Sequence, residues 1–490
     1  MSNMLRYEQP FSSGTVGCNR FRIPAILTLN DSTVLAAADL RYNNGADSPN
    51  NLDTLVAKSQ DGYSGWTYSK VNYFDDYADD ITDKASASFI DAALVQSKKT
   101  DRIFIITDAW TSNGGYPTAK KGSGYAYIDG IRRLLLTKGS TRDEIETFEY
   151  YLGDFNDGFA DVFLLQGDEK TAYSVDSEYN LYKSGELLYQ KQVGSDKMVA
   201  QKIFYEEADL KLYCTCYLWL RYSDDNGKTW SSPKIISESV KSDKEAFLGI
   251  CPGRGICFDY ENKERIMFCV YDNTLSQERV STIYSDDNGE TWHRGKPTDV
   301  KKAVKKTSES QLVMLNNGVV RIYARNAYDY VAYADSTDGG VTFDKFKADT
   351  ELSCRKNCMV SFINLKREIG GKPAIIGSYP YNTYSRSDGM LKVGVVEDNN
   401  EVTWISEYHV NEGPYAYSCL TELENGEIGL LYEDSDFSIR YIILDMDENG
   451  VLSLVSGKDI DYKGKLSVAH TIINVFKKLK FKINKCLDLV

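Results

Sequence analysis

The sequence predicts an all-β protein built as a β-propeller, a ring of small antiparallel sheets. Three observations support this fold class. An eight-residue turn motif recurs along the chain, the segments around its copies alternate like strands, and helical patterns are few. The 490 residues include 35 tyrosines and 36 glycines, which is typical of many short strands joined by turns.

The turn motif combines an aspartate, a glycine and a closing aromatic residue. Two clear copies span 223–230 and 285–292, a third spans 336–343, and a degenerate fourth spans 59–66. The aspartate can accept hydrogen bonds from backbone amides of its own turn, the glycine takes a positive φ, and the aromatic ring anchors the turn on the core. A hairpin that recurs every 50 to 60 residues or so has roughly the spacing of one propeller blade.

The strand pattern around these turns is clearest over 33–38, 265–270, 319–324 and 428–432. The rhythm breaks over 105–212, which contains no copy of the motif. We interpret this segment as a small β-rich domain inserted between two propeller strands in an early blade. The propeller itself is then expected to comprise 1–104 and 213–462.

The last segment, 463–490, changes to helical periodicity. Its apolar residues lie at helical spacing and are flanked by lysines: Val468, Ile472, Val475, Phe476, Leu479 and Ile483. We expect an amphipathic C-terminal helix packed on the propeller. A helix for a membrane surface or a partner protein is the alternative.

Composition excludes several classes of function. A net charge of −14 argues against nucleic acid or an anionic membrane as the main partner, although an arginine cluster can still reverse the field inside one pocket. Three histidines, and ten cysteines without a Cys-x-x-Cys pair, predict no metal and no cofactor. No apolar run reaches the ~20 residues of a membrane span. The start of the chain has no signal-peptide core, so we expect a cytoplasmic protein or an extracellular one whose leader has been removed.

Residues that could carry chemistry cluster over 21–47. Arg22 lies in Phe-Arg-Ile-Pro, Arg41 follows an alternating apolar strand, and a polar loop ends in Asp47. Loops held by a rigid sheet often carry binding groups, and arginine grips a planar carboxylate with two parallel hydrogen bonds. From this stretch alone, a surface charge at the start of a strand is an equally good interpretation of Arg22.

The combination of Phe-Arg-Ile-Pro, several Ser-x-Asp-x-Gly-x-Thr-Trp turns and a late Tyr-Ser resembles the bacterial exo-α-sialidases over nearly the whole chain. The resemblance implies six blades, a pocket at one end of their axis, and an inserted domain on the pocket's face. It implies that Arg22, Arg325 and Arg386 hold the carboxylate of sialic acid, and that Arg41 contacts the O4 side of the sugar. The expected partner is a sialylated glycan, bound by a monomer.

The resemblance also implies an acid/base carboxylate and a reader of the N-acetyl group. Asp47 matches the acid/base residue, which would protonate the departing glycosidic oxygen and then activate water. Chemistry alone does not separate it from Asp39 and Asp53. Asp91, together with Ile90 before it, resembles the part of the site that recognises the N-acetyl side.

Tyr417 matches the nucleophile of the family, with Tyr415 as the runner-up, and Glu309 matches its partner base. A tyrosine suits this chemistry because the anomeric carbon of sialic acid already bears a carboxylate, which would repel an anionic nucleophile. Sialidases are an exception to the two-carboxylate rule of glycosidases for this reason. A phenol with an ordinary pKa near 10 needs a base and cationic neighbours to react at neutral pH.

These residues imply hydrolysis of terminal sialic acid with retention, through a covalent tyrosyl intermediate. The alternative is an intramolecular trans-sialidase, in which the substrate's own hydroxyl attacks and 2,7-anhydro-sialic acid leaves. Those relatives place a tryptophan shortly after the nucleophile, whereas 432–440 contains Phe437 and no tryptophan, which favours hydrolysis; the similarity of 47–53 to them keeps the alternative open. A silent glycan-binding propeller would keep the turns but could lose the catalytic residues. An inverting glycosidase would need no arginine trio.

Overall fold

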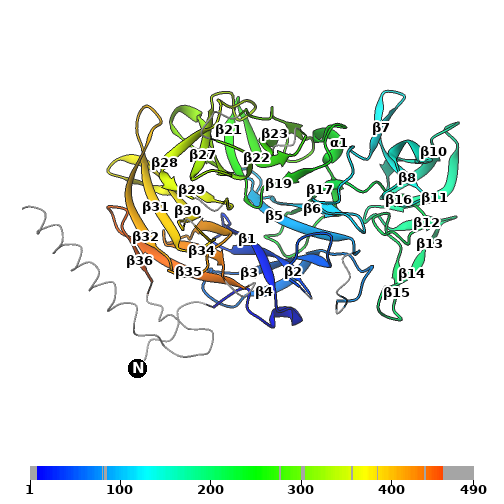
Figure 1. Cartoon of the computed structure of the whole chain (residues 1–490), viewed down its shortest axis with the longest axis horizontal. Helices are drawn as coiled ribbons and strands as arrows, with labels where there is room; N and C mark the ends of the chain where they lie inside the picture. Colours follow the sequence, from blue (N-terminus) through cyan, green and yellow to red (C-terminus); the bar gives the residue numbers. More distant parts are fainter. Residues whose placement is uncertain are drawn as a thin grey trace, which may run out of the picture.

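The structure, a computed structural model, describes residues 8–42, 44–79, 81, 85–274, 278–299, 304–354, 357–382, 384–434 and 438–455. Within these residues, six sheets surround a central axis as the blades of a β-propeller (Figure 1). The predicted fold class is therefore confirmed. The C-terminal helix expected over 463–490 lies outside the described residues.

Each blade has four main strands, ordered as a meander. The first contains β1 (Phe21–Thr28), β2 (Val34–Arg41), β3 (Leu52–Ser59) and β4 (Thr67–Asn72). The second contains β5 (Ser88–Gln96), β6 (Ile103–Trp110), β17 (Cys216–Ser223) and β18 (Lys234–Ile235), with β20 (Gly253–Arg254) parallel to β5. The third contains β19 (Leu248–Ile250), β22 (Lys263–Asp272), β23 (Arg279–Ser285) and β24 (His293–Arg294), with β21 (Ile256–Tyr260) beside β22.

The last three blades follow one another without interruption. The fourth contains β25 (Thr307–Met314), β26 (Val320–Asn326), β27 (Tyr330–Ser336) and β28 (Lys347–Ser353). The fifth contains β29 (Ser361–Ile369), β30 (Lys372–Pro380), β31 (Gly389–Val396) and β32 (Val402–His409). The sixth contains β33 (Ser418–Glu422), β34 (Ile428–Glu433), β35 (Ile439–Met446) and β36 (Leu452–Leu454). The described helices are short: α1 (Ser237–Val240) and the 3-10 turns η1 (Thr15–Gly17), η2 (Ile145–Thr147) and η3 (Asn316–Gly318).

The recurring turn motif connects the third and fourth strands of a blade. In the copy after β17, the Asp225 carboxylate accepts a hydrogen bond from the Thr229 amide at 2.9 Å, and the Gly227 amide donates to the Ser223 hydroxyl at 2.9 Å. The copies after β23 and β27 repeat both bonds around Asp287 and Asp338. The motif thus satisfies its own backbone, which explains why it can be recognised from sequence.

Contacts between the first and last blades close the ring. The Thr28 amide of β1 donates to the Thr421 hydroxyl of β33 at 3.0 Å, across 393 residues of sequence. Two residues earlier in β1, the Ile26 amide donates to the Cys419 sulfur at 3.4 Å. This closure brings the beginning of β1 beside the beginning of β33, where several of the expected site residues lie.

The insertion leaves the second blade between β6 and β17. These two strands pair along their whole length, from Ile103 with Ser223 to Trp110 with Cys216. The boundary expected at residue 105 therefore falls inside a propeller strand, and the excursion runs over 111–215. It forms a separate sheet at one side of the propeller (Figure 1) from β7 (Tyr125–Ile128), β8 (Ile131–Thr137), β9 (Tyr150–Asn156), β10 (Phe159–Leu164), β11 (Lys170–Asp176), β12 (Leu181–Lys183), β13 (Glu186–Leu187) and β16 (Lys211–Leu212), with the hairpin β14 (Tyr189–Lys191) and β15 (Met198–Ala200) beside it.

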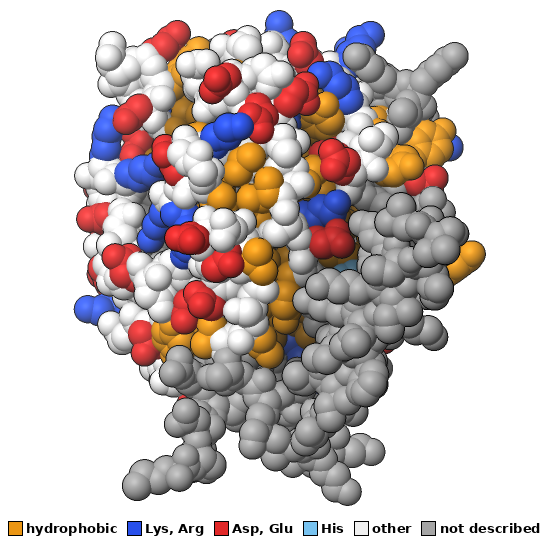
Figure 2. Space-filling model, turned by 90° about the vertical axis from the view of Figure 1, so that its left-hand side faces the viewer, with side chains coloured by type: hydrophobic (Ala, Val, Ile, Leu, Met, Phe, Trp, Pro, Cys, Tyr) orange, Lys and Arg blue, Asp and Glu red, His pale blue; other side chains and the backbone are white. Residues whose placement is uncertain are grey.

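The visible surface agrees with the composition. Figure 2 shows acidic and basic side chains interspersed on the described part of one face, with apolar side chains gathered near its centre. The described side chains of that face therefore form no continuous basic patch of the kind that binds nucleic acid. In the described part of the chain, no helix is long and apolar enough to span a membrane.

Candidate active site

A cavity of about 490 Å³ lies at one end of the propeller axis, where the inner strands begin. The structure brings eight of the nine expected site residues to its wall: Arg22, Asp47, Ile90, Asp91, Glu309, Arg325, Arg386 and Tyr417. Arg41 is the exception and lies behind the wall. Residues separated by hundreds of positions thus share one pocket.

Irregularities in three inner strands coincide with the residues that line this cavity. The pairing register shifts between Arg22 and Ala25 in β1, between Ile90 and Ala93 in β5, and between Thr307 and Ser310 in β25. Ile23 and Asp91 also adopt positive φ values of 59° and 65°. A bulge re-aims side chains locally, so these distortions turn the site residues toward the axis.

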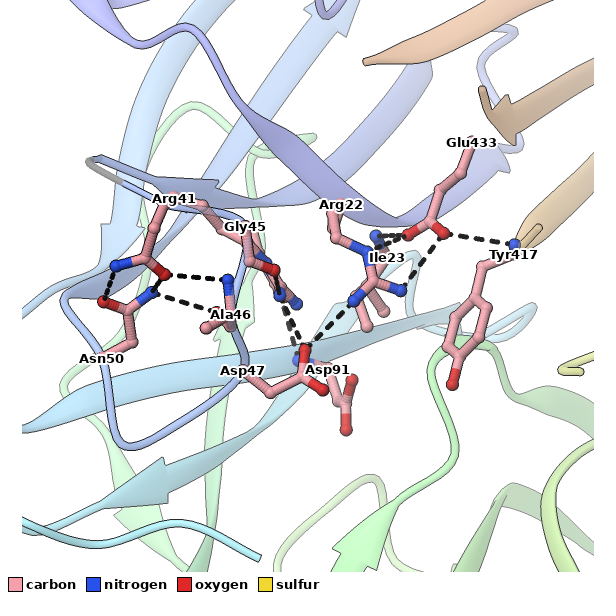
Figure 3. Close-up of polar contacts among 12 residues, drawn as sticks. Arg22, Ile23, Arg41, Gly45, Ala46, Asp47, Asn50, Asp91, Tyr417 and Glu433 are labelled. Atoms are coloured by element: carbon pink, nitrogen blue, oxygen red, sulfur yellow. Dashed lines mark hydrogen bonds and ion pairs between the residues drawn. The ribbon is translucent and has the colours of Figure 1, made fainter. Parts of the chain in front are cut away.

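Each of the three arginines is held by a neighbour. Arg22 makes a fork-to-fork pair with Glu433, with Nε and Nη2 at 3.1 and 3.2 Å from the two carboxylate oxygens (Figure 3). Arg325 Nε donates to the Asn357 side chain at 2.9 Å, and Arg386 Nη2 donates to the Asn357 carbonyl at 3.1 Å. Burial lowers the pKa of Arg22, but Glu433 and Asp47 outweigh burial and raise it overall.

Tyr417, Glu309 and Arg325 form a triangle at the cavity wall. The Tyr417 hydroxyl donates a hydrogen bond to Glu309, and Arg325 Nη1 contacts the Glu309 carboxylate and lies 2.8 Å from the Tyr417 oxygen. Burial and the Glu309 charge raise the pKa of Tyr417 well above its ordinary value, against the opposing effect of Arg325 and Arg386. The phenol is therefore neutral at rest, and its hydrogen-bond acceptor is a carboxylate that can receive its proton.

The runner-up tyrosine is not at the cavity. Tyr415 is fully buried, its hydroxyl lies 2.5 Å from the Ser378 hydroxyl, and its ring stacks on Tyr432 with centroids 4.8 Å apart. Of the two candidates, Tyr417 alone has its oxygen beside a base and an arginine. The geometry therefore favours Tyr417.

Asp47 lies on a loop at the edge of the cavity. Its carboxylate is 3.1 Å from Arg22 Nη1 and 2.6 Å from Arg41 Nη1, and its side chain is 62% exposed (Figure 3). Burial raises the pKa of Asp47, but Arg41 and Arg22 more than offset this and hold it below the ordinary value. Beside these two arginines Asp47 is thus an ionised carboxylate, and it must gain a proton before it can act as an acid.

The other early charged residues support the loop from behind. Arg41 has no exposed side-chain surface, and it bonds Asp39 at 2.8 Å and the Gly45 carbonyl at 2.8 Å. Arg41 is not among the residues that line the cavity, whereas Asp47, which it contacts, is; a contact between Arg41 and the sugar stays a prediction. Asp53 is buried and paired with Lys70 at 2.9 Å. Asp39 and Asp53 therefore do not compete with Asp47.

The deep part of the cavity is both acidic and aromatic. Asp91 and Asp108 each have a buried carboxyl oxygen without a hydrogen-bond partner among the described residues. Burial, together with nearby carboxylates, raises the pKa of both well above the ordinary value. Trp110 stacks on Phe247 beside them, with the two rings 6.0 Å apart and nearly parallel. This part of the cavity can hold a small, partly apolar substituent and offer it hydrogen bonds.

Several residues in or behind the cavity wall had no signal in the sequence. Glu433 and Asn357 orient the arginines, and their roles depend on contacts across the ring. Tyr116 belongs to the insertion, lines the cavity and donates a hydrogen bond to Glu278 at 3.0 Å. The insertion therefore reaches the rim of the pocket through its first turn. Among the described residues, no group of three or more histidine, cysteine or acidic side chains is placed to hold a metal ion.

The fold is a six-bladed propeller, and three arginines meet a tyrosine–glutamate pair in its cavity. Such a site suits a ligand that bears a carboxylate. Residues 198–430 match the family model described as BNR repeat-like domain. The solved intramolecular trans-sialidase of Ruminococcus gnavus is 32% identical, with a TM-score of 0.84 over 92% of this chain and 100% of that chain. The chain belongs to the sialidase family.

Two further members of the family are similar to this chain over most of its length. The anhydrosialidase of the leech Macrobdella decora is 33% identical over 466 residues, which cover 88% of this chain and 60% of the leech protein. Sialidase B of Streptococcus pneumoniae is 29% identical over 463 residues, covering 88% and 64% of the two chains. The chain thus spans slightly less than two thirds of these curated relatives.

Proposed function

We propose that this chain is an intramolecular trans-sialidase that removes terminal sialic acid from glycoconjugates and releases it as 2,7-anhydro-sialic acid. The observation that carries the reaction class is the convergence of Arg22, Arg325 and Arg386 beside the Tyr417–Glu309 pair. The choice of product is supported by the relatives, one of which is called an anhydrosialidase and another an intramolecular trans-sialidase. It reverses the preference for hydrolysis drawn from the sequence.

Binding begins with the substrate carboxylate. The three guanidiniums offer forked donors to one planar anion, and Glu433 and Asn357 keep all three oriented before the ligand arrives. The Cζ atoms of Arg22 and Arg386 lie 5.5 and 5.3 Å from the centroid of the Tyr417 ring. The anomeric carbon next to the bound carboxylate is thereby brought close to the phenol.

In the first step, Tyr417 attacks the anomeric carbon as Glu309 takes the phenolic proton. The bond from that carbon to the glycosidic oxygen breaks, and the departing oxygen takes a proton from Asp47. Arg325 contacts both Tyr417 and Glu309, so its positive charge stabilises the developing phenolate. The products of this step are a covalent sialyl–tyrosine intermediate, in which the phenolic oxygen forms an aryl glycoside with the anomeric carbon, and a free aglycone.

In the second step, the O7 hydroxyl of the sugar's own side chain attacks the anomeric carbon. Asp47, now ionised, takes the O7 proton, while the bond from carbon to Tyr417 breaks and Glu309 returns a proton to the phenol. No water is consumed. A narrow site that keeps water from the intermediate favours this outcome over hydrolysis.

Hydrolysis to free sialic acid is the second candidate function. The observation in its favour is the sequence of 432–440, which contains Phe437 and no tryptophan. Residues 435–437 lie outside the described part of the chain, so this argument rests on sequence alone. In hydrolysis, water replaces O7 as the nucleophile in the second step, and every other role is unchanged.

The experiment that separates these functions is cleavage of sialyllactose in water enriched in oxygen-18, followed by mass analysis of the released sugar. Intramolecular transfer gives a sugar lighter than sialic acid by one water molecule and free of the heavy isotope. Hydrolysis gives sialic acid labelled at the anomeric oxygen. Tyr417→Phe is the matched control and should release neither product. Saturable binding of sialyllactose by the wild-type chain without release of any sugar would support a silent binding propeller instead.

A further inference from the structure

A second cavity, of about 410 Å³, lies at the opposite end of the propeller axis. It is lined by the later residues of the same inner strands whose first residues line the active site. In β1 these are Leu27 and Thr28 rather than Arg22, and in β25 they are Leu312 and Met314 rather than Glu309. The two cavities are therefore separated by the length of the inner strands along the propeller axis.

Packed side chains around Gly253 lie between the two cavities. A Cβ atom at Gly253 would lie only 3.1 Å from both the Gln311 amide nitrogen and the Met359 terminal methyl, and 3.5 Å from the Cys419 sulfur. Gln311 is held there because its side-chain nitrogen donates to the Pro252 carbonyl at 2.7 Å. A ligand in the far cavity does not need to pass through the active site.

Arg254, the residue after Gly253, lines the far cavity and has few hydrogen-bond partners among the described residues. Nη1 donates to the Leu420 carbonyl at 3.2 Å, and no carboxylate of the described residues lies within ion-pair distance of its guanidinium. Comparable arginines are fully paired: Arg265 holds Asp286 through two bonds of 2.7 Å, and Arg321 holds Asp335 at 2.6 and 2.7 Å. Burial lowers the pKa of Arg254, and the opposing effects of Cys419 and Glu422 do not offset it.

Neighbouring polar groups in the far cavity are already satisfied by one another. The Thr28 and Thr421 hydroxyls lie 2.9 Å apart, and the Asn364 side chain both donates to and accepts from the Met314 backbone. The Glu422 carboxylate accepts the Lys366 amide at 2.6 Å. Two lysines, Lys98 and Lys366, also line the cavity, but Arg254 alone among its lining residues offers a planar fork of donors, of which only Nη1 is bonded to a described residue.

We propose that the far cavity binds a small molecule that bears a carboxylate, with the carboxylate on Arg254. A planar guanidinium fork matches a planar carboxylate. Because Glu422 is already negative and lies nearby, a ligand with one negative charge should fit better than a ligand with two. The apolar side chains of Leu312 and Phe362, which line the same cavity, would cover the ligand's carbon skeleton. The volume lies within the range of ~300–1,000 Å³ that is usual for ligand pockets.

The test uses benzoate as the probe, because it combines one carboxylate with an apolar ring. The arginines of the active site could also bind benzoate, so the experiment starts from the full chain with Arg325→Ala. Saturation-transfer NMR should detect bound benzoate in that variant. Adding Arg254→Gln should weaken binding by at least about tenfold, because the charged hydrogen bonds are lost. Benzamide, the neutral analogue, should bind neither protein.

Stability and activity provide independent readouts. Benzoate should raise the Tm of Arg325→Ala but not of the double variant, and Arg254→Gln alone should keep sialoside turnover within about twofold because Arg254 lies outside the active site. Arg254→Lys keeps the charge but not the fork, so it should fold and bind benzoate with reduced affinity. Benzoate binding that is unchanged by both substitutions, no saturable binding to Arg325→Ala, or equal competition by inorganic phosphate would each overturn the proposal. None of these results depends on the sialidase reaction.

Discussion

The hydroxyl of Tyr417 donates a hydrogen bond to the carboxylate of Glu309, 108 residues earlier in the chain. Tyr417 lies just before the first strand of the sixth blade, and Glu309 lies in a bulge of the first strand of the fourth. Arg325 contacts both, so the pair keeps its geometry without a ligand. A phenol that is neutral and already bonded to its base is prepared for proton transfer when the anomeric carbon arrives.

Tyr417→Phe should abolish turnover while the fold survives. The change deletes the attacking oxygen but keeps the ring, and Glu309 and Arg325 remain paired with each other. The free energy of unfolding should therefore change by about 1 kcal/mol or less. Tyr415→Phe is the matched control, because it removes a buried hydroxyl that lies away from the cavity. A fluorinated sialyl donor should label only the wild-type peptide with Tyr417, and labelling at Tyr415 or Glu309 would contradict the mechanism.

Arg325→Ala should lower kcat/KM on a sialoside by tens to thousands of fold. The substitution removes a charged partner of the substrate carboxylate, which commonly costs about 2 to 5 kcal/mol. Arg321→Ala is the control, because Arg321 lies on the same strand but pairs with Asp335 away from the cavity. It should reduce stability and leave the turnover of folded enzyme nearly unchanged. Steady-state kinetics alongside thermal melts distinguish the two, and near-normal activity of Arg325→Ala would rule out its proposed role.

Glu433→Gln should raise KM more than it lowers kcat. Glu433 holds Arg22 through two bonds of 3.1 and 3.2 Å and accepts the amides of Ile23 and Tyr417 at 2.8 and 3.4 Å, so its strongest effect is on the alignment of Arg22, and it does not contact the reacting phenol oxygen. We expect KM to rise by roughly tenfold. A hydrogen bond to a charged group is worth about 1.5–3 kcal/mol, and a misaligned Arg22 should lose part of that. Glu427→Gln, on the same hairpin but bonded to Tyr63, provides the comparison. A fall confined to kcat would show that Glu433 acts on the chemical step.

The pH dependence should differ between free enzyme and complex. Arg41 and Arg22 hold the pKa of Asp47 below its ordinary value, so its acid form declines as the pH rises through the acidic range. The substrate carboxylate offsets the charge of Arg22 and should therefore raise the pKa of Asp47 in the complex. With sialyllactose, the alkaline fall of kcat should lie at higher pH than that of kcat/KM. An aryl sialoside, whose leaving group needs little protonation, should show a weaker fall, and identical profiles for both substrates would contradict the role of Asp47.

The candidates that the sequence left open were separated by position in the folded chain. Asp39, Asp47 and Asp53 are similar in chemistry and close in sequence, but the first and third are buried against Arg41 and Lys70 while Asp47 reaches the cavity. Tyr415 and Tyr417 are two residues apart, yet only Tyr417 meets Glu309. The supporting residues Glu433 and Asn357 could not be predicted, because their partners lie in other blades.

The sequence by itself determined the blade architecture, and it predicted nine site residues, eight of which line one cavity in the structure. Each recurrent turn is specified by bonds between a serine, an aspartate and amides within eight residues, as around Asp225, so its information is local. The tertiary structure alone decided which charged groups face the axis, where the insertion begins, and that Arg254 occupies a second cavity. These features depend on closure of the ring between Thr28 and Thr421, 393 residues apart, and no local pattern encodes which side chains such a closure brings together.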